Sequence, residues 1–318
     1  MATTVSASPL DLVSPRARRE VPSLIWAAPG AVIGALVMIA VHRGLIDDAY
    51  ITLGYARNMA THLHWGLIPT ETSNTATSPL NIVLLTLSTW LAAPFTGGIH
   101  PVVGLGVLSV VLCGALTLWA AQVSRRIGVS PAWSLAVLAV VLANPFVNSA
   151  IGLEVLPISA LLTGLLAAAV SGRRVAFGLA AGALVLTRLD LLVIVAIVFL
   201  LSPGVRSRPW VASGVAAALA LPWFVFSWWA LGSAIPTSFV IKTLQRSFGD
   251  RTFLNGPWTL WLGHGLLPLL LAVVPAVLGV LTALTLAVAG VARRLPARLW
   301  PLVGLAFGGV AYLSLIHI

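Results

Sequence analysis

Apolar stretches close to the length of a bilayer crossing alternate with short polar connections along most of the chain. A helix needs about 20 consecutive apolar residues to cross the hydrocarbon core. The stretches lie at 23–41, 79–95, 101–123, 131–147, 155–170, 175–187, 190–202, 210–231, 262–290 and 299–318. This pattern predicts an all-α fold, a polytopic transmembrane helical bundle with about ten membrane segments.

The composition excludes an ordinary soluble domain. Of the 318 residues, 59% are hydrophobic and 8% are charged, whereas soluble domains carry about 25% charged residues. The mean hydropathy is +1.03. The single cysteine, Cys113, lies in an apolar stretch, which excludes a disulfide framework and a cysteine metal cluster.

The net charge of +10 reflects membrane orientation and does not indicate nucleic-acid binding. Seventeen of the eighteen basic residues are arginines, most of them in short connections between apolar stretches, which is typical of cytoplasmic loops. We expect twelve of the eighteen on the cytoplasmic side: Arg16, Arg18, Arg19, Arg125, Arg126, Arg173, Arg174, Arg206, Arg208, Arg293, Arg294 and Arg298. The Arg-rich and Ala/Val/Leu/Gly-rich composition favours a GC-rich bacterium and its plasma membrane.

The chain divides into a polar tail at 1–22, expected in the cytoplasm, and a membrane domain at 23–318. The stretch at 23–41 is long for a signal peptide and is predicted to be a retained first span. Outer loops are expected at 42–78 and 232–257. The chain ends inside an apolar stretch without a polar flank, so we expect a truncated C-terminus.

The number of crossings near the N-terminus is left open by this assignment. Two apolar stretches, 79–95 and 101–123, separate the outer loop at 42–78 from Arg125. If that loop lies outside and Arg125 lies in the cytoplasm, the chain must cross the membrane an odd number of times between them. Either 79–95 is re-entrant, or one crossing is hidden, or Arg125 and Arg126 lie outside.

A second ambiguity concerns 175–187 and 190–202, which each reach only about 20 Å at 1.5 Å per residue. Two short helices would leave Thr187–Asp190 in a recessed cavity. The alternative is one long helix with an internal Arg188–Asp190 pair. In either case charges at this depth are expected to face the bundle interior or water.

The strongest candidate for chemistry is the pair Asp47 and Asp48, directly after the first apolar stretch. Adjacent carboxylates at a membrane surface repel each other and are poorly solvated, which makes one of them a candidate general base. Apolar side chains then recur at a spacing of four, at Ile51, Tyr55, Met59 and Leu63. This spacing predicts a short amphipathic helix at the interface. The alternative is a solvated acidic start to that helix, favoured by its dipole.

Lys242, the only lysine, follows Pro236 and Thr237 in the second outer loop. Its ammonium group beside hydroxyls could hold a phosphate, or it could contact lipid headgroups. Glu154 and Asp190 lie at the outer ends of later apolar segments. At such positions an acidic residue more often forms a structural ion pair or caps a helix than takes part in catalysis. The histidines His62, His64 and His264 match no metal motif, so we expect no metal ligands.

Two motifs carry a family resemblance. The block Asp47–Asn58 (DDAYITLGYARN), followed by Thr77–Leu80 (TSPL), resembles polytopic bacterial glycosyltransferases of the GT-C superfamily, in particular arabinofuranosyltransferases and protein-mannosyltransferase-like enzymes. The segments 152–154, 187–190 and 236–242 follow in the order such proteins show. The resemblance covers about residues 25–290, and most of its specificity lies in the Asp-Asp block. Leu189 departs from the family, in which proline is expected between arginine and the acidic residue.

The resemblance implies an enzyme that moves a sugar from a polyprenyl-phosphate carrier to a glycan, lipid or protein acceptor with inversion, on the extracytoplasmic side. Asp47 or Asp48 would be the general base, and Lys242 and Arg188 would bind the donor phosphate. Supporting residues would be Tyr50, Arg57, Ser78, Glu154, Asp190 and Thr237. No cofactor is firmly implied, and a divalent cation is left open.

Two other functions compete with this one. A secondary transporter or lipid flippase would use Asp190, Glu154 and Arg188 as an intramembrane relay. A non-catalytic factor in envelope assembly would tolerate neutralisation of Asp47 and Asp48.

Overall fold

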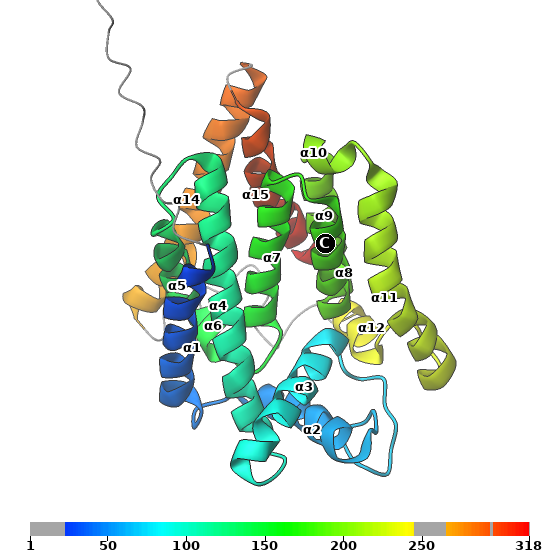
Figure 1. Cartoon of the computed structure of the whole chain (residues 1–318). Helices are drawn as coiled ribbons and strands as arrows, with labels where there is room; N and C mark the ends of the chain where they lie inside the picture. Colours follow the sequence, from blue (N-terminus) through cyan, green and yellow to red (C-terminus); the bar gives the residue numbers. More distant parts are fainter. Residues whose placement is uncertain (1–22, 245–264, 293–294, 318) are drawn as a thin grey trace, which may run out of the picture.

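The computed structural model describes residues 23–244, 265–292 and 295–317. In this part of the chain the regular structure is helical, and no strand is present. The helices are α1 (Ala27–Val41), α2 (Asp47–His62), α3 (Pro79–Thr96), α4 (Pro101–Ile127), α5 (Trp133–Ala143), α6 (Pro145–Ser149), α7 (Val155–Val170), α8 (Arg174–Thr187), α9 (Leu192–Leu200), α10 (Pro203–Arg206), α11 (Pro209–Leu231), α12 (Thr237–Leu244), α14 (Leu266–Val291) and α15 (Trp300–His317). Figure 1 shows them as one bundle.

The prediction of an all-α membrane protein is confirmed at this level. Among the described residues, five helical spans are long and apolar enough to cross a membrane: Leu24–Val41, Pro79–Thr96, Pro101–Ile127, Pro209–Leu231 and Leu266–Val291. Four further apolar helices within the described residues are 10–17 residues long. The expected total of about ten crossings stays a prediction, because these shorter helices do not meet the length of a full crossing.

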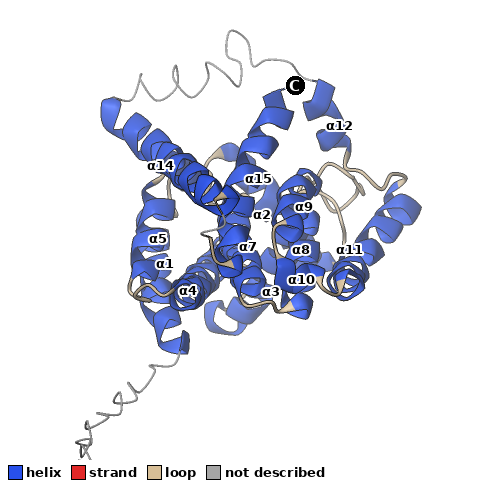
Figure 2. Cartoon of the chain, turned by 90° about the horizontal axis from the view of Figure 1, so that it is seen from above, coloured by secondary structure: helices blue, strands red, loops and turns tan. Residues whose placement is uncertain are grey.

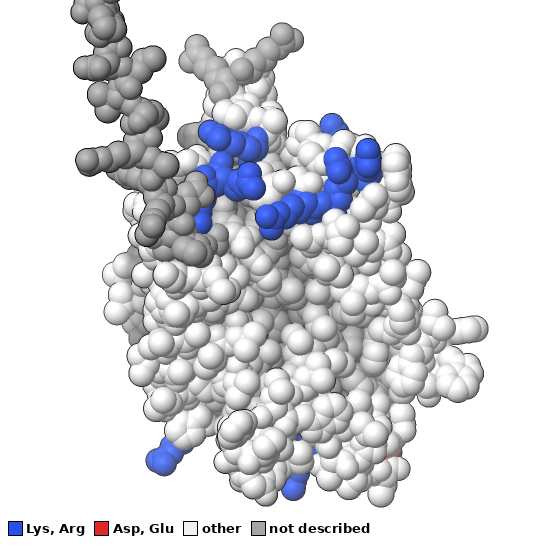
Figure 3. All heavy atoms as spheres, in the orientation of Figure 1, with Lys and Arg blue, Asp and Glu red and all other residues white. Residues whose placement is uncertain are grey.

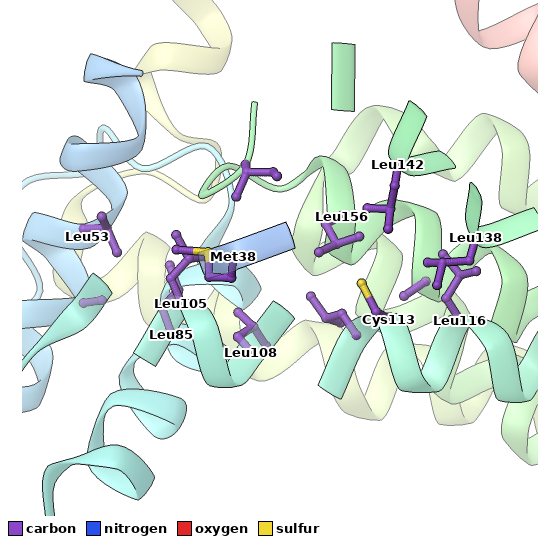
Figure 4. Close-up of a cluster of buried hydrophobic side chains, with 14 residues drawn as sticks. Met38, Leu53, Leu85, Leu105, Leu108, Cys113, Leu116, Leu138, Leu142 and Leu156 are labelled. Atoms are coloured by element: carbon purple, nitrogen blue, oxygen red, sulfur yellow. The ribbon is translucent and has the colours of Figure 1, made fainter. Parts of the chain in front are cut away.

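Helix α4 is the centre of the first half of the bundle, where it packs against α1, α3, α5 and α7. Leucines from four of these helices surround Met38 and Cys113 in the largest apolar cluster (Figure 4). Helix α1 approaches closely because it presents glycine: a Cβ at Gly30 would lie 2.5 Å from the carbonyl oxygen of Cys113. Small residues allow this kind of backbone contact between membrane helices.

Helix α3 does not continue the bundle toward the far end. It begins at Pro79 and ends at a short turn, 97–100, from which α4 starts in the opposite direction. Figure 1 shows α2 and α3 side by side at one end of the molecule, while α4 extends from there to the other end. The Trp90 indole N–H of α3 donates to the carbonyl of Ala60 in α2 at 2.9 Å. Because α3 is itself long and apolar enough to cross a membrane, the three alternatives for the crossing count stay open.

The two ends of the bundle differ in charge. We call the end that carries α2 and α3 the α2 end, and the opposite one the arginine end. The arginine end holds the described arginines of four connections: Arg125, Arg126, Arg173, Arg174, Arg206, Arg208 and Arg298. Figure 3 shows these basic side chains gathered there, with few at the α2 end. The expected cytoplasmic placement of these connections stays a prediction.

The second half of the bundle is built on a tight contact between α8 and α11, visible from above in Figure 2. Gly178 and Gly182 form a G-x-x-x-G pair on α8, and a Cβ at Gly178 would lie 2.5 Å from the carbonyl oxygen of Ala212. The two backbones therefore touch without side chains between them.

Candidate functional site

The candidate site lies at the α2 end, where α2 begins with its two aspartates. Asp47 and Asp48 are both exposed. The Asp48 backbone N–H donates to Asp47 Oδ1 at 3.0 Å, so one carboxylate supports the first turn of α2. Negative charge is favourable at a helix N-terminus. Asp48 has no described hydrogen bond from its side chain and faces outward, where it is free to meet a ligand.

Gly152 brings the starts of α2 and α3 together with the start of α7. Its φ is +101°, which favours glycine. A Cβ at this position would lie 2.8 Å from the Cβ of Ala49, which directly follows Asp48. From the other side, the Asn81 side-chain amide of α3 donates to the Gly152 carbonyl at 3.3 Å. The aspartate pair therefore adjoins the segment that leads, two residues later, to Glu154.

Glu154 belongs to a network centred on Arg188. Arg188 donates from Nη1 to Glu154 Oε1 at 3.1 Å and from Nη2 to Asp190 Oδ2 at 2.8 Å. Its Nε donates to Asp190 Oδ1 at 3.1 Å. The Tyr312 hydroxyl donates to Asp190 Oδ2 at 3.2 Å. The network thus joins α7, α15 and the connection between α8 and α9.

The helix is interrupted at Arg188, and this interruption lets the Arg188 side chain reach both carboxylates. Helix α8 ends at Thr187, and Arg188 is extended, with φ −157° and ψ 125°. A 3-10 turn over Leu189–Leu191 then leads into α9. Of the two alternatives from the sequence, two short helices with the charges between them is therefore the one found.

The network carries a net charge of −1 and is largely enclosed. The side chains of Arg188, Glu154 and Asp190 are 27%, 12% and 19% exposed. All three guanidinium nitrogens of Arg188 already bind carboxylate oxygen. An incoming phosphate could bind Arg188 only by displacing one of these carboxylates.

A second polar cluster fixes the connection between α2 and α3. The Tyr55 side chain is fully buried, and its hydroxyl bonds to Ser73 Oγ and, at 2.7 Å, to Thr75 Oγ1. The Tyr55 ring lies 5.7 Å from that of Trp65, which in turn lies 4.5 Å from Trp223 of α11. The loop is therefore packed on the body of the protein.

Asn74 ties this loop to the entrance of α12. Its Nδ2 donates to the Ser233 carbonyl at 2.8 Å and to Ser227 Oγ at 3.3 Å. Its own carbonyl accepts from the Thr237 N–H at 2.9 Å, in the first turn of α12. We call this set of bonds the Asn74 clamp.

The remaining predicted residues are dispersed around these clusters. Tyr50 and Arg57 are exposed on α2, and Ser78 is buried before α3 with its hydroxyl unpaired. Thr237 takes part through its backbone N–H. Lys242 lies in α12, and its side chain is outside the described residues.

Residues 245–257 of the expected outer loop 232–257 lie outside the described residues, and the place of this loop outside the membrane stays a prediction. Before them the chain forms a helix, α12, from Thr237. The physical reason is the Asn74 clamp, which gives a partner to one of the N–H groups that a helix start leaves free. The predicted helix after Asp48 is present as α2. Its place at a membrane interface stays a prediction.

Several residues of these clusters were not identified as functional candidates from the sequence, among them Asn74, Asn81 and Tyr312. For Tyr312 and Asn81 there was a signal, since each is a polar side chain inside an apolar stretch, where such residues usually bind a partner. Asn74 gave no local signal, because its partners are 153 and 159 residues away.

The described residues contain no group of three or more His, Cys, Asp or Glu that could hold a metal ion. His64 Nε2 is hydrogen-bonded to the Glu71 carbonyl at 3.0 Å, and His62 is exposed. His264 lies outside the described residues.

Comparison of the chain with protein-family models, curated proteins and solved structures found no match.

Proposed function

We propose that this protein is a GT-C-type glycosyltransferase that moves a sugar from a polyprenyl-phosphate carrier to an envelope glycan, lipid or protein, at a site on the α2 end. The observation that carries the proposal is the junction at Gly152. It places the exposed aspartate pair beside the segment that leads to the Glu154–Arg188–Asp190 network. A lipid-linked donor requires this kind of site, with carboxylates next to apolar helices.

In the proposed reaction an aspartate at the start of α2 takes the proton of the acceptor hydroxyl. The acceptor oxygen forms a bond to the anomeric carbon, the bond from that carbon to the phosphate oxygen breaks, and polyprenyl phosphate leaves. Asp48 is the better candidate for the base, since Asp47 is engaged with the backbone of α2. Removal of a general base typically lowers the rate by about 10²–10⁴-fold.

The departing phosphate needs positive charge, for which Lys242 and Arg188 are the proposed ligands. Arg188 would serve by exchanging one carboxylate for a phosphate oxygen, which keeps its charge compensated throughout. The same exchange would release Glu154 or Asp190 for a contact with the sugar. Tyr50 and Arg57, exposed on α2, are proposed to contact the acceptor.

A second candidate, a transporter or lipid flippase, is favoured by one observation. The enclosed Arg188 network joins three parts of the bundle, as a charge relay would. This function requires Arg188 but neither aspartate of α2.

The test measures sugar transfer from a panel of polyprenyl-phosphate sugars in membranes that contain the full chain. We compare wild type with Asp47→Asn, Asp48→Asn and a matched control, Glu71→Gln, at equal expression. Glu71 is an exposed acidic residue in the loop between α2 and α3, and its described bonds involve only its backbone. We expect Asp48→Asn to lose at least a hundredfold in rate and Glu71→Gln to retain wild-type activity.

Each other outcome has a distinct meaning. Transfer that survives both aspartate substitutions would refute the assignment of the base. A folded wild-type protein that transfers no sugar from a broad panel, yet moves a labelled lipid across a vesicle membrane, would favour the flippase.

A further inference from the structure

A groove opens at the arginine end, between the first turns of α8 and α11. Its volume is about 580 Å³. Its basic residues are Arg173, Arg174 and Arg208, and its apolar walls include Val175, Leu179 and Val211. Val175 and Leu179 are 54% and 49% exposed, so this apolar wall is open to the surroundings of the bundle.

The packing of α8 on α11 explains where the groove ends. Gly178 touches the backbone of Ala212, which closes the space between the helices on the side toward the bundle centre. One turn earlier, Arg174 of α8 reaches the α10–α11 connection, where its Nη2 donates to Ser207 Oγ at 2.7 Å. The groove is therefore a built feature with a rigid floor and a basic rim.

The rim carries positive charge that nothing in the described part of the chain neutralises. The two ion pairs found among the described residues both belong to Arg188. Arg174 Nε is buried and has no hydrogen-bond partner. A buried donor without a partner is costly, but the protein's own atoms cover this nitrogen, so the guanidinium groups open to a ligand are those of the exposed Arg173 and Arg208.

The helix ends add to this field. Arg173 and Arg208 are the N-cap residues of α8 and α11, and neither side chain caps its helix. A helix N-terminus carries partial positive charge, so cations there are unfavourable unless an anion is near. Two helix starts and three guanidinium groups thus converge on one groove.

We propose that this groove binds an anionic phospholipid. The phosphate would accept hydrogen bonds from Arg173 and Arg208, and an acyl chain would lie along Val175, Leu179 and Val211. A free phosphate would satisfy the arginines but would leave the apolar wall uncovered. Basic pockets between membrane helices on the cytoplasmic side are known to bind such headgroups. The site is at the opposite end of the bundle from the proposed catalytic site and does not depend on it.

The test measures lipid binding by the purified full chain in a non-ionic detergent, using native mass spectrometry with added phosphatidylglycerol or phosphatidylcholine. The groove variant is Arg173→Gln/Arg208→Gln. The matched control is Arg126→Gln/Arg298→Gln, which removes the same charge from exposed residues elsewhere at the arginine end. We expect wild type and control to prefer phosphatidylglycerol, and the groove variant to lose at least tenfold in affinity for it.

A third variant, Leu179→Trp, keeps the charge and fills the apolar wall. We expect it to weaken phosphatidylglycerol binding while its unfolding temperature stays near that of wild type. Equal losses in the groove variant and its control would show a diffuse surface charge and overturn the proposal. So would unchanged binding in Leu179→Trp, equal affinity for both lipids, or full displacement of the lipid by millimolar inorganic phosphate.

Discussion

Arginine occupies two opposite environments in this protein. At the α2 end, Arg188 is enclosed and its guanidinium nitrogens all bind the carboxylates of Glu154 and Asp190. At the arginine end, Arg173 and Arg208 are exposed and form no ion pair with any described residue.

The difference separates two uses of the same side chain. The charge of Arg188 is matched inside the chain, so it stabilises the bundle, and in the proposed reaction it binds a phosphate only by exchanging one carboxylate. The charges of Arg173 and Arg208 must be matched from outside the described residues, by water, salt or lipid, so their effect is on orientation and binding. The Arg188–Asp190 pair named from the sequence is found in the structure, whereas the orientation inferred from the exposed arginines stays a prediction.

The largest expected loss of stability comes from removing the positive charge of Arg188, which neutralises Glu154 and Asp190. Arg188→Gln leaves Glu154 and Asp190 enclosed without a cation, and we expect a loss of about 3 kcal/mol in the free energy of unfolding. The corresponding change at the other end, Arg173→Gln, should alter stability by less than about 0.5 kcal/mol. Thermal unfolding in detergent, followed by circular dichroism, measures both.

A variant that lacks all three charges tests whether the loss of stability in Arg188→Gln is due to charge. Arg188→Gln/Glu154→Gln/Asp190→Asn removes all three charges together and should recover most of the lost stability, because no charge is left unpaired. If the triple variant is as unstable as Arg188→Gln, packing of the long arginine side chain is responsible and the charge account is refuted.

A smaller loss of stability is expected at the close contact between α8 and α11. Gly178→Ala places a Cβ 2.5 Å from the Ala212 carbonyl oxygen, which forces α8 away from α11 and should cost about 2 kcal/mol. Gly214→Ala is the matched control, because a Cβ there meets nothing within 4 Å. That substitution should be neutral or should stabilise by up to about 1 kcal/mol. Equal unfolding temperatures for both variants would contradict the close contact.

The smallest effect concerns the hydrogen bond from Tyr312 to Asp190. Tyr312→Phe removes the hydroxyl and leaves Asp190 with its three bonds from Arg188, so we expect a loss of about 1 kcal/mol. Tyr50→Phe, at an exposed position of α2, should leave stability unchanged. A double variant with Arg188→Gln tests whether the two losses are coupled, as members of one network require.

Much of the fold follows from hydrophobic patterning. Each predicted apolar stretch contains a described helix, because a bilayer-length apolar run has few other stable conformations in lipid. The pattern could not show that α3 turns back at the α2 end, since this depends on its contacts with α2 and α4. It also missed α12, whose first turn is held by Asn74.

The candidate site was predictable where the chemistry is local. Asp47, Asp48, Glu154, Arg188 and Asp190 are rare charges next to apolar stretches, and the structure brings the last three into direct contact. The contact of Gly152 with Ala49, which follows the aspartate pair, depends on a left-handed backbone conformation that no spacing rule identifies. Tyr312 joins Asp190 over 122 residues of sequence, a distance at which pattern carries no information.

The Asn74 clamp has a consequence for the time course of biosynthesis. Asn74 must wait for Ser233, which is 159 residues further along the chain. At a synthesis rate of about 5–20 residues per second, this wait lasts about 8–30 s. During that interval α1 and α4 can already pair, while the segment between α2 and α3 lacks its partners on the 233–237 segment. A nascent chain arrested before Ser233 should therefore expose Asn74 to proteases that the finished protein resists.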